Sequence, residues 1–335
     1  MINMKQWLGQ QMTATPRKAL PILSFPSIDL TGAAVRQLVT DSAIQAAGMA
    51  AVAQRCDAAA AVSVMDLSVE AECFGAEILF EEGEVPTVVG SLVNTMEEAQ
   101  GLPAPRVGDA RSGVFVEAVR IACETITDRP VLAGAIGPYS LASRLMDVTQ
   151  AMVNCYVEPE MVHTVLDKVT VFLTDYIGAF KAVGAAGVIL AEPAAGLLTP
   201  ELCQEFSSDY VRRIVEAVQD DDFVVVYHNC GGAIDRLVPE ILSTGAAAYH
   251  FGNAVEITAM LEQMPNDLLV MGNVDPVGVL RNGTPELVRE NTLAIMNNAT
   301  KYANFLISSG CDIPPGTPWD NLDAFFAAVA EFHSH

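Results

Sequence analysis

Eight short apolar runs recur along this chain, and longer stretches of helical character separate them. Each run is mostly continuous in apolar residues, which is typical of strands that are covered on both faces of a parallel sheet. The runs span residues 19–25, 59–67, 131–137, 186–191, 223–227, 246–251, 268–272 and 304–308.

The stretches between the runs carry signals for helix starts. Asp41 precedes a series of good helix formers, and Thr199 stands before Pro200 as a cap would. Pro285 and Pro318 open two further helical stretches in the same way. Alternation of strand and helix fits either a closed barrel or a large open doubly wound sheet, and the count of eight favours the α/β (β/α)8 TIM barrel.

The chain is expected to form one catalytic barrel, residues 19–335, preceded by a segment, residues 1–18, that packs on it as a helix. Residues 71–113 form an unusually long connection after the second strand, with acidic residues, Gly and Pro. This insertion is expected to form a hairpin or a lid. No Gly- or Ser-rich linker divides the chain.

The charge of the chain excludes some partners. It has 41 Asp and Glu against 18 Lys and Arg, a formal net charge of −23. Nucleic acids and anionic membranes are therefore not expected as partners, because both require clustered Lys and Arg. No apolar run is long enough to span a bilayer, and the polar start resembles no secretory signal. Seven cysteines without regular spacing suggest reduced thiols in the cytoplasm.

The most informative motif is the segment YHNCGG at the end of the fifth run. It contains His228, which directly follows the run, and Cys230 two residues later. Residues two apart in an extended backbone point to the same face, so both side chains can point into a barrel mouth. Cys311 follows the eighth run, and closure of the barrel can bring it to the same mouth. The other cysteines, Cys56, Cys73, Cys123, Cys155 and Cys203, are expected to be structural.

One imidazole and two thiolates form a donor set that suits zinc. Three protein ligands with an open fourth position are typical of catalytic zinc, whereas structural sites usually take four ligands from closely spaced pairs. A thiol bound in the fourth position would be deprotonated and nucleophilic at neutral pH, and its natural partner is an electrophilic methyl group. A His-x-Cys pair alone is weak evidence, since Cys is often a small buried hydrophobe.

Two further polar residues stand at strand ends beside this motif. Glu192 ends the fourth run, where it could be a fourth ligand or a catalytic proton acceptor for the thiol, or could simply bind a loop amide. His250 lies within or just at the end of the sixth run and could support a ligand, contact substrate or be a core histidine.

Four more residues at strand ends are candidates for substrate binding. Tyr139, Asn273 and Asp275 follow apolar runs, and Asp66 lies near the end of the run 59–67. For Asp275 the alternative is a cap of the following turn, and for Tyr139 and Asp66 a packing role.

The segments LAEPAAGLL, YHNCGG, GNVDP and SSGCDIPPGTP, in this order, resemble the uroporphyrinogen decarboxylase superfamily. The chain is most similar to the methylcobamide:coenzyme M methyltransferase branch, and the resemblance covers it from about Pro21 to its end. That branch binds zinc through a His-x-Cys pair and a distant Cys, which here are His228, Cys230 and Cys311. The resemblance implies a (β/α)8 barrel.

The resemblance also implies an activity. A methyl group would pass from a methylated corrinoid to a zinc-bound thiol such as coenzyme M, whose sulfonate would need a cation; Arg144 and Arg281 are candidates. No Asp-x-His-x-x-Gly pattern for binding B12 occurs in the sequence, so the corrinoid is expected on a separate protein.

Two other functions remain open, a decarboxylase-like lyase without metal and a non-catalytic binding subunit. The true decarboxylases hold substrate carboxylates with an Arg-rich N-terminal motif. Here only Arg17 and Lys18 are basic in that region, which disfavours a porphyrinogen substrate.

Overall fold

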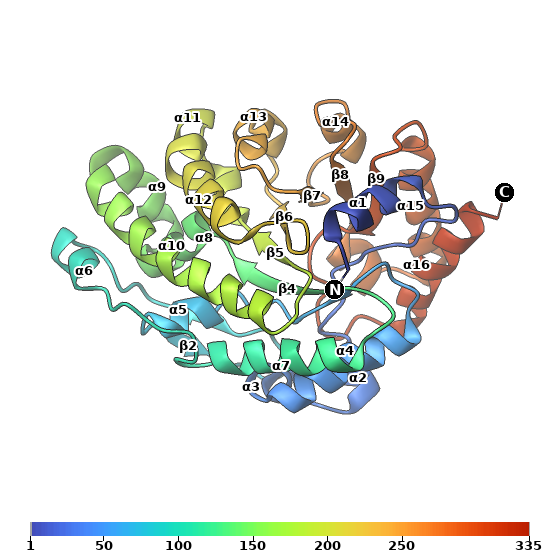
Figure 1. Ribbon diagram of the computed structural model, residues 1–335, viewed down its shortest axis with the longest axis horizontal. Coiled ribbons are helices and arrows are strands. Elements are labelled where there is room, and N and C mark those ends of the chain that lie inside the picture. Colours follow the sequence, from blue (N-terminus) through green and yellow to red (C-terminus); the bar gives the residue numbers. More distant parts are fainter. Residues whose placement is uncertain (1, 335) are drawn as a thin grey trace.

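The computed structural model describes residues 2–334 and shows a curled parallel sheet inside a ring of helices (Figure 1). Over these residues, seven strands pair in parallel in the order β1-β4-β5-β6-β7-β8-β9. The strands are β1 (Ala61–Val62), β4 (Val131–Ile136), β5 (Gly187–Ala191), β6 (Val224–Asn229), β7 (Ala248–Phe251), β8 (Leu269–Val274) and β9 (Phe305–Ser309). This is the expected α/β barrel architecture.

The first expected strand, residues 19–25, closes the ring without being a regular strand. The Leu20 N–H donates to the Ile307 carbonyl of β9 at 3.0 Å, and the Ala59 N–H donates to the Ala19 carbonyl at 2.8 Å. The segment therefore bridges the last strand and the chain leading into β1. Pro21 has no N–H to offer a ladder, which explains why the pairing on both sides stays sparse.

Helices follow most strands and cover the outside of the sheet. The predicted starts are confirmed where Asp41 caps α4 and where Thr199 caps α11, each by a side-chain hydrogen bond. The helices of the first half are α2 (Ser27–Thr31), α3 (Val35–Thr40), α4 (Ser42–Arg55), α5 (Val69–Cys73), α6 (Met96–Gly101), α7 (Ser112–Thr125), α8 (Pro138–Met146), α9 (Val148–Val157) and α10 (Pro159–Ala182).

In the second half, the helix expected after Thr199 is divided by a π-helical turn, η2 (Gln204–Ser208). The other elements of this half are η1 (Pro193–Leu197), α11 (Pro200–Cys203), α12 (Asp209–Val218), η3 (Ile234–Arg236), α13 (Val238–Leu242), α14 (Ile257–Leu261), η4 (Pro276–Arg281), α15 (Pro285–Asn298) and α16 (Trp319–Phe332).

The N-terminal helix α1 (Met4–Thr13) closes one end of the barrel. Its Met4, Trp7 and Leu8 are buried and join the apolar cluster that fills the barrel interior. The Met4 N–H also donates to the Asp221 carbonyl, in the turn just before β6. Figure 1 draws α1 over β8 and β9, two strands that it contacts. Because α1 covers the end at which strands begin, the opposite end remains for chemistry.

The long connection after the second apolar run contains a short antiparallel hairpin, β2 (Glu77–Leu79) and β3 (Thr87–Val89). The expectation of a hairpin in residues 71–113 is thus confirmed. Its turn contributes Val85 and Pro86 to a pocket described below.

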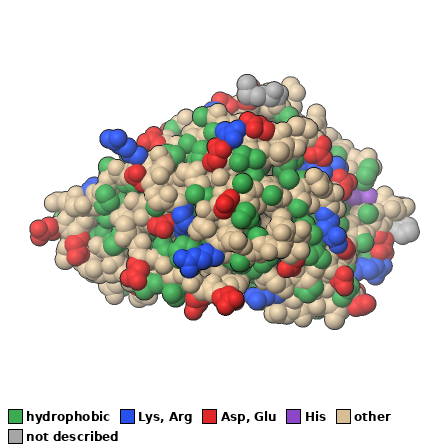
Figure 2. All heavy atoms as spheres, turned by 90° about the horizontal axis from the view of Figure 1, so that it is seen from below, with side chains coloured by type: hydrophobic (Ala, Val, Ile, Leu, Met, Phe, Trp, Pro, Cys, Tyr) green, Lys and Arg blue, Asp and Glu red, His purple; other side chains and the backbone are tan. Residues whose placement is uncertain are grey.

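Two properties of the remaining surface and helices bear on partners. On the face drawn in Figure 2, Lys and Arg side chains are scattered singly among Asp and Glu and form no broad basic patch. Among residues 2–334, none of the helices combines the length and apolar character that crossing a bilayer requires.

Candidate metal centre

Three potential metal ligands meet at the end of the barrel where strands finish. His228 lies in the last part of β6, Cys230 follows that strand, and Cys311 follows β9. One ligand atom from each lies within 4.8 Å of the others, and His228 Nε2 lies 3.5 Å from Cys311 Sγ. His228 is buried, whereas the two cysteines are partly accessible. The group is therefore open on one side.

The local backbone explains how these side chains are held. Within β6, Val224, Val226 and His228 alternate inward, and the first two belong to the apolar filling of the barrel. A Cβ at Gly252 would lie 2.6 Å from the Cβ of Cys230, so glycine is needed there for the close approach.

The donor geometry fits zinc. Tetrahedral bonds of about 2.3 Å to sulfur and about 2.0 Å to nitrogen place those two ligand atoms about 3.5 Å apart, which is the spacing of His228 Nε2 and Cys311 Sγ. Among residues 2–334 this is the cluster of His, Cys, Asp and Glu side chains that is compact enough for a metal ion. Three ligands leave a fourth position for a substrate atom.

The thiol groups of Cys230 and Cys311 affect each other's pKa. A hydrogen bond from the Cys311 thiol, with help from His228, lowers the pKa of Cys230 to about 4 despite its burial. The same contact and burial raise the pKa of Cys311 well above its ordinary value. Cys230 is therefore shifted toward the thiolate form, which is the form of cysteine that binds a metal ion.

His250 contacts the metal-ligand group directly. Its Nδ1 lies 2.8 Å from Nδ1 of His228, and its Nε2 lies 2.8 Å from the hydroxyl of Ser308 in β9. All three side chains are fully or almost fully buried. Ser308 is not among the site residues predicted from the sequence. It lies two residues after the buried Leu306 in β9, and side chains two apart on a strand share a face, so the sequence pattern could have placed Ser308 inside the barrel.

Glu192 is placed differently from the ligands. Its carboxyl oxygens accept hydrogen bonds from the Tyr139 N–H, the Ser140 N–H and the Ser140 hydroxyl, at 2.5–3.1 Å. It thus caps the N-terminus of α8 from the neighbouring strand end. Burial raises the pKa of Glu192 to about 7. The compact ligand cluster does not include it, and the binding of amides is the alternative that this geometry favours.

The expected substrate-binding residues near strands β4 and β8 make structural contacts. Tyr139 is fully buried in the outer core. The Asn273 amide donates to the carbonyls of Gly252 and Val255, which braces the loop after β7. Asp275 accepts from the N–H groups of η4, as a cap.

Asp66 lies in a buried ion pair. Its carboxylate pairs with Arg111 and accepts from the N–H and hydroxyl of Ser68. Arg111 also binds Glu72 at 2.6 Å. This network ties the loop after β1 to the start of α7, which is the packing role left open above.

A pocket of about 260 Å³ lies next to the metal-ligand group, because Asp312 beside Cys311 lines it. Arg144, from the last turn of α8, lines it as well. Among residues 2–334, the Arg144 guanidinium makes neither a hydrogen bond nor a salt bridge. Burial lowers the pKa of Arg144, and the charges of Glu70 and Asp66 act in the opposite direction. The other lining residues come from four separate segments: Phe25, Met65, Leu67, Ser68, Val85, Pro86, Thr87 and Pro314.

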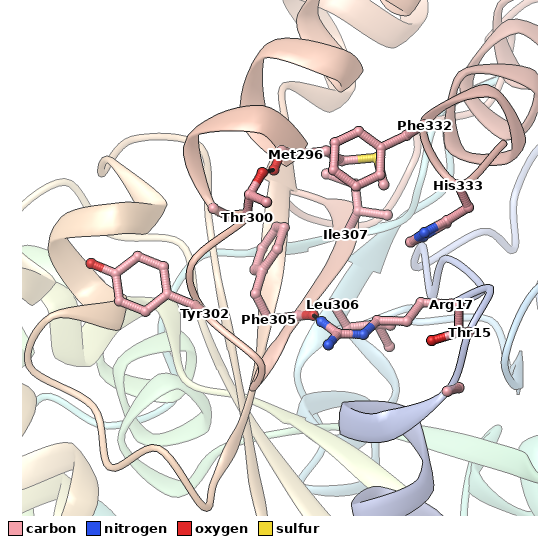
Figure 3. A pocket seen from close by; sticks show the side chains of 12 residues that line it. Thr15, Arg17, Met296, Thr300, Tyr302, Phe305, Leu306, Ile307, Phe332 and His333 are labelled. Atoms are coloured by element: carbon pink, nitrogen blue, oxygen red, sulfur yellow. Dashed lines mark hydrogen bonds between the residues drawn. The ribbon is translucent and has the colours of Figure 1, made fainter. Parts of the chain in front are cut away.

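A separate cavity of about 210 Å³ lies near the start of β9, between that strand and the last helices (Figure 3). Arg17 lines it, and its guanidinium donates to the carbonyls of Met12 and Phe305. Phe305 begins β9, and Cys311 follows the other end of the same strand. Arg17 therefore lies at the opposite end of the barrel from the metal-ligand group.

The fold and the site together define the class of the protein as a parallel α/β barrel with a candidate metal site at its mouth. The family model described as uroporphyrinogen decarboxylase (URO-D) matches residues 14–332. The chain belongs to this family.

Relatives within the family have different names. The chain is 30% identical over 264 residues to a methylcobamide:CoM methyltransferase, MtbA, of Methanosarcina acetivorans, which covers 77% of this chain and 75% of that protein. It is 27% identical over 260 residues to a uroporphyrinogen decarboxylase of Coxiella burnetii, covering 74% and 70%. A solved methyltransferase from Methanosarcina mazei superposes with a TM-score of 0.85 over 99% of this chain and all of that one, at 22% identity, and so shares the fold. The similarity to methyltransferases supports methyl transfer as the general class of activity.

Proposed function

We propose that this protein is a zinc-dependent methyltransferase that moves a methyl group from a methylated corrinoid to a thiol. The observation that carries the proposal is the meeting of His228 Nε2 and the sulfurs of Cys230 and Cys311 at an open barrel mouth. The relatives named for methylcobamide:CoM methyl transfer support the same activity.

The chain's own residues would hold the metal and orient the thiol. When bound, zinc would lower the pKa of the acceptor thiol and so keep it as a nucleophile at neutral pH. The thiolate sulfur would form a bond to the methyl carbon of the donor, and the bond between that carbon and its corrinoid carrier would break, with the electron pair leaving on the carrier. His228, Cys230 and Cys311 supply three ligands and leave the fourth position to the substrate.

We assign the corrinoid to a separate protein that docks over the mouth, since the sequence lacks a B12-binding pattern. Such a reaction needs reduced thiols, which suits a cytoplasmic protein. Glu192 is a positioning residue in this proposal, because its carboxyl group is engaged at the start of α8.

The acceptor would carry an anionic group. Arg144 lines the pocket beside Cys311 and Asp312, and its guanidinium makes neither a hydrogen bond nor a salt bridge among residues 2–334. The carboxyl groups of Glu70 and Asp66 act on it only through their charge, so a bound anionic group would give this buried cation a direct partner. A short thiol with a sulfonate, such as coenzyme M, would meet this requirement. Arg281, the other candidate, ends η4 and does not line this pocket.

A porphyrinogen lyase is less consistent with the positions of the basic residues. Arg17 binds two backbone carbonyls at the far end of β9 and does not face the mouth. A substrate with many carboxylates would lack this cation as a partner.

Zinc content tests the proposal. The purified protein is expected to retain one zinc per chain after dialysis, and Cys230→Ala or Cys311→Ala is expected to lose it. Cys123→Ala, on the outer helix α7, is the matched control and should retain it. A folded, metal-free wild-type protein would contradict the proposal.

Turnover separates an enzyme from a binding subunit. Zinc-loaded protein should demethylate methylcobalamin when 2-mercaptoethanesulfonate is present, and Arg144→Met should reduce its preference for this thiol over uncharged 2-mercaptoethanol by ~10-fold or more. An unchanged preference would remove Arg144 from the acceptor site. Stoichiometric zinc without any demethylation would indicate the binding subunit.

A further inference from the structure

A line of buried polar groups runs across the barrel interior from a backbone carbonyl to the proposed metal ligand. It begins at the Leu20 carbonyl, continues through the Ser308 hydroxyl at 2.7 Å and the His250 ring at 2.8 Å, and reaches Nδ1 of His228. The three side chains come from neighbouring positions of the barrel wall, since His228 pairs in register with His250 and β8 lies between β7 and β9.

The direction of these hydrogen bonds follows from the carbonyl at the start of the line. A carbonyl oxygen can only accept, so the Ser308 hydroxyl donates its proton to Leu20. The Ser308 oxygen must then accept from His250 Nε2, which places the single ring proton of neutral His250 on Nε2. His250 Nδ1 is left as an acceptor, and His228 donates to it from Nδ1.

A second contact gives the same direction independently. His228 Nδ1 also lies 3.3 Å from the carbonyl oxygen of His250, which again can only accept. In the reverse direction, the Leu20 carbonyl would lose the Ser308 donor, and His228 Nδ1 would face a carbonyl with its own lone pair. A buried acceptor left without a donor is energetically costly, so the reverse arrangement is strongly disfavoured.

The direction of these hydrogen bonds determines the state of Nε2, on the other side of the His228 ring. With the proton on Nδ1, Nε2 carries the lone pair and points to Cys311 Sγ at 3.5 Å. We propose that His250 and Ser308 are positioning residues that hold His228 in the tautomer and orientation needed to bind a metal through Nε2, with the Leu20 carbonyl setting the direction. As far as it concerns zinc, this inference rests on the proposed function.

Ring nitrogen NMR with ¹⁵N-labelled histidine tests the tautomer in the zinc-free protein. His250 is expected to show a protonated Nε2 and an unprotonated Nδ1, and His228 a protonated Nδ1. The assignment comes from the loss of signals in His228→Ala and His250→Phe. A protonated Nδ1 on His250 overturns the inference. Because this measurement needs no metal, a protein that fails to bind zinc loses the proposed function but still reports the direction of the line.

Zinc affinity tests the positioning role. Competition with a chromophoric chelator should show His250→Phe, which keeps a ring but no nitrogen, binding zinc ~10–100-fold more weakly. Ser308→Ala should weaken binding in the same direction. His250→Asn should recover much of the affinity, because the amide oxygen stands near the position of Nδ1 and can accept from His228.

Two control variants separate positioning from general damage. His163→Phe changes a histidine that stacks on Phe206, outside the line of hydrogen bonds. Ser207→Ala removes a buried hydroxyl that has no hydrogen-bond partner within residues 2–334. Both should keep the zinc affinity of the wild type. If His250→Phe unfolds, Ser308→Ala and the wild-type NMR experiment decide the matter. Unchanged affinity in folded His250→Phe overturns the positioning role.

Discussion

Glu70 provides a test of buried electrostatics that does not involve the proposed metal site. This α5 residue is 2% exposed, its Oε1 accepts from the Ile136 N–H at 3.0 Å, and its Oε2 has no hydrogen-bond partner among residues 2–334. Burial raises the pKa of Glu70 from 4.5 to about 7. The folded protein therefore binds this proton more tightly than the unfolded chain does.

The sign of the effect follows from proton linkage. Between pH 4.5 and pH 7 the folded state holds more protons than the unfolded state, so the free energy of unfolding falls as the pH rises. With these two pKa values, the contribution of Glu70 drops by about 2 kcal/mol between pH 5.5 and pH 8. Glu70→Gln removes the titration, and the variant should gain that amount relative to the wild type over the same interval.

Urea unfolding followed by circular dichroism at pH 5.5 and pH 8 measures this difference. At each pH the free energy of unfolding of the wild type is subtracted from that of the variant, and the two differences are then compared. Any cost of the new amide that does not depend on pH cancels in this comparison. Glu216→Gln, at an exposed position of α12, is the matched control and should show no such change. If Glu70→Gln has the same effect at both pH values, the carboxyl group is not held protonated by burial and the reasoning fails.

Three further substitutions test the packing around the site by urea unfolding. Asp66→Asn should cost ~3 kcal/mol because it leaves Arg111 buried with a weakened partner, and an unchanged midpoint would show that the pair is solvated. Gly137→Ala should cost ~1–3 kcal/mol, since its Cβ would lie 2.2 Å from Glu192 Oε2; a neutral result would mean that the carboxyl group moves freely. Trp7→Ala should cost ~3 kcal/mol by opening the closed end of the barrel, unless α1 is not part of the folded core.

The sequence was sufficient to predict the barrel and the hairpin because both depend on local patterns. Continuous apolar runs report burial on two faces, and eight of them with helices between leave few topologies. The motif around His228 could be interpreted for a related reason. Residues two apart on a strand share a face, and the ends of parallel strands share an edge, so sequence position alone indicates proximity.

Other features depend on contacts between segments far apart in the chain. Residues 19–25 looked like the first strand, but Pro21 reduces its pairing to a few hydrogen bonds with its neighbours. Glu192 stood at a strand end like the ligands, yet its engagement depends on where α8 begins on the adjacent strand. No local pattern encodes that placement.

The fold class, the ligand types and their common edge were thus encoded in residue order, since periodicity and chain direction determine them. The partners of individual side chains required the three-dimensional arrangement. Ser308, His250 and the Leu20 carbonyl form one line only because the closed barrel brings β7, β9 and the first segment together. Arg144 reaches the pocket beside Cys311 for the same reason, because barrel closure joins segments that are about 170 residues apart.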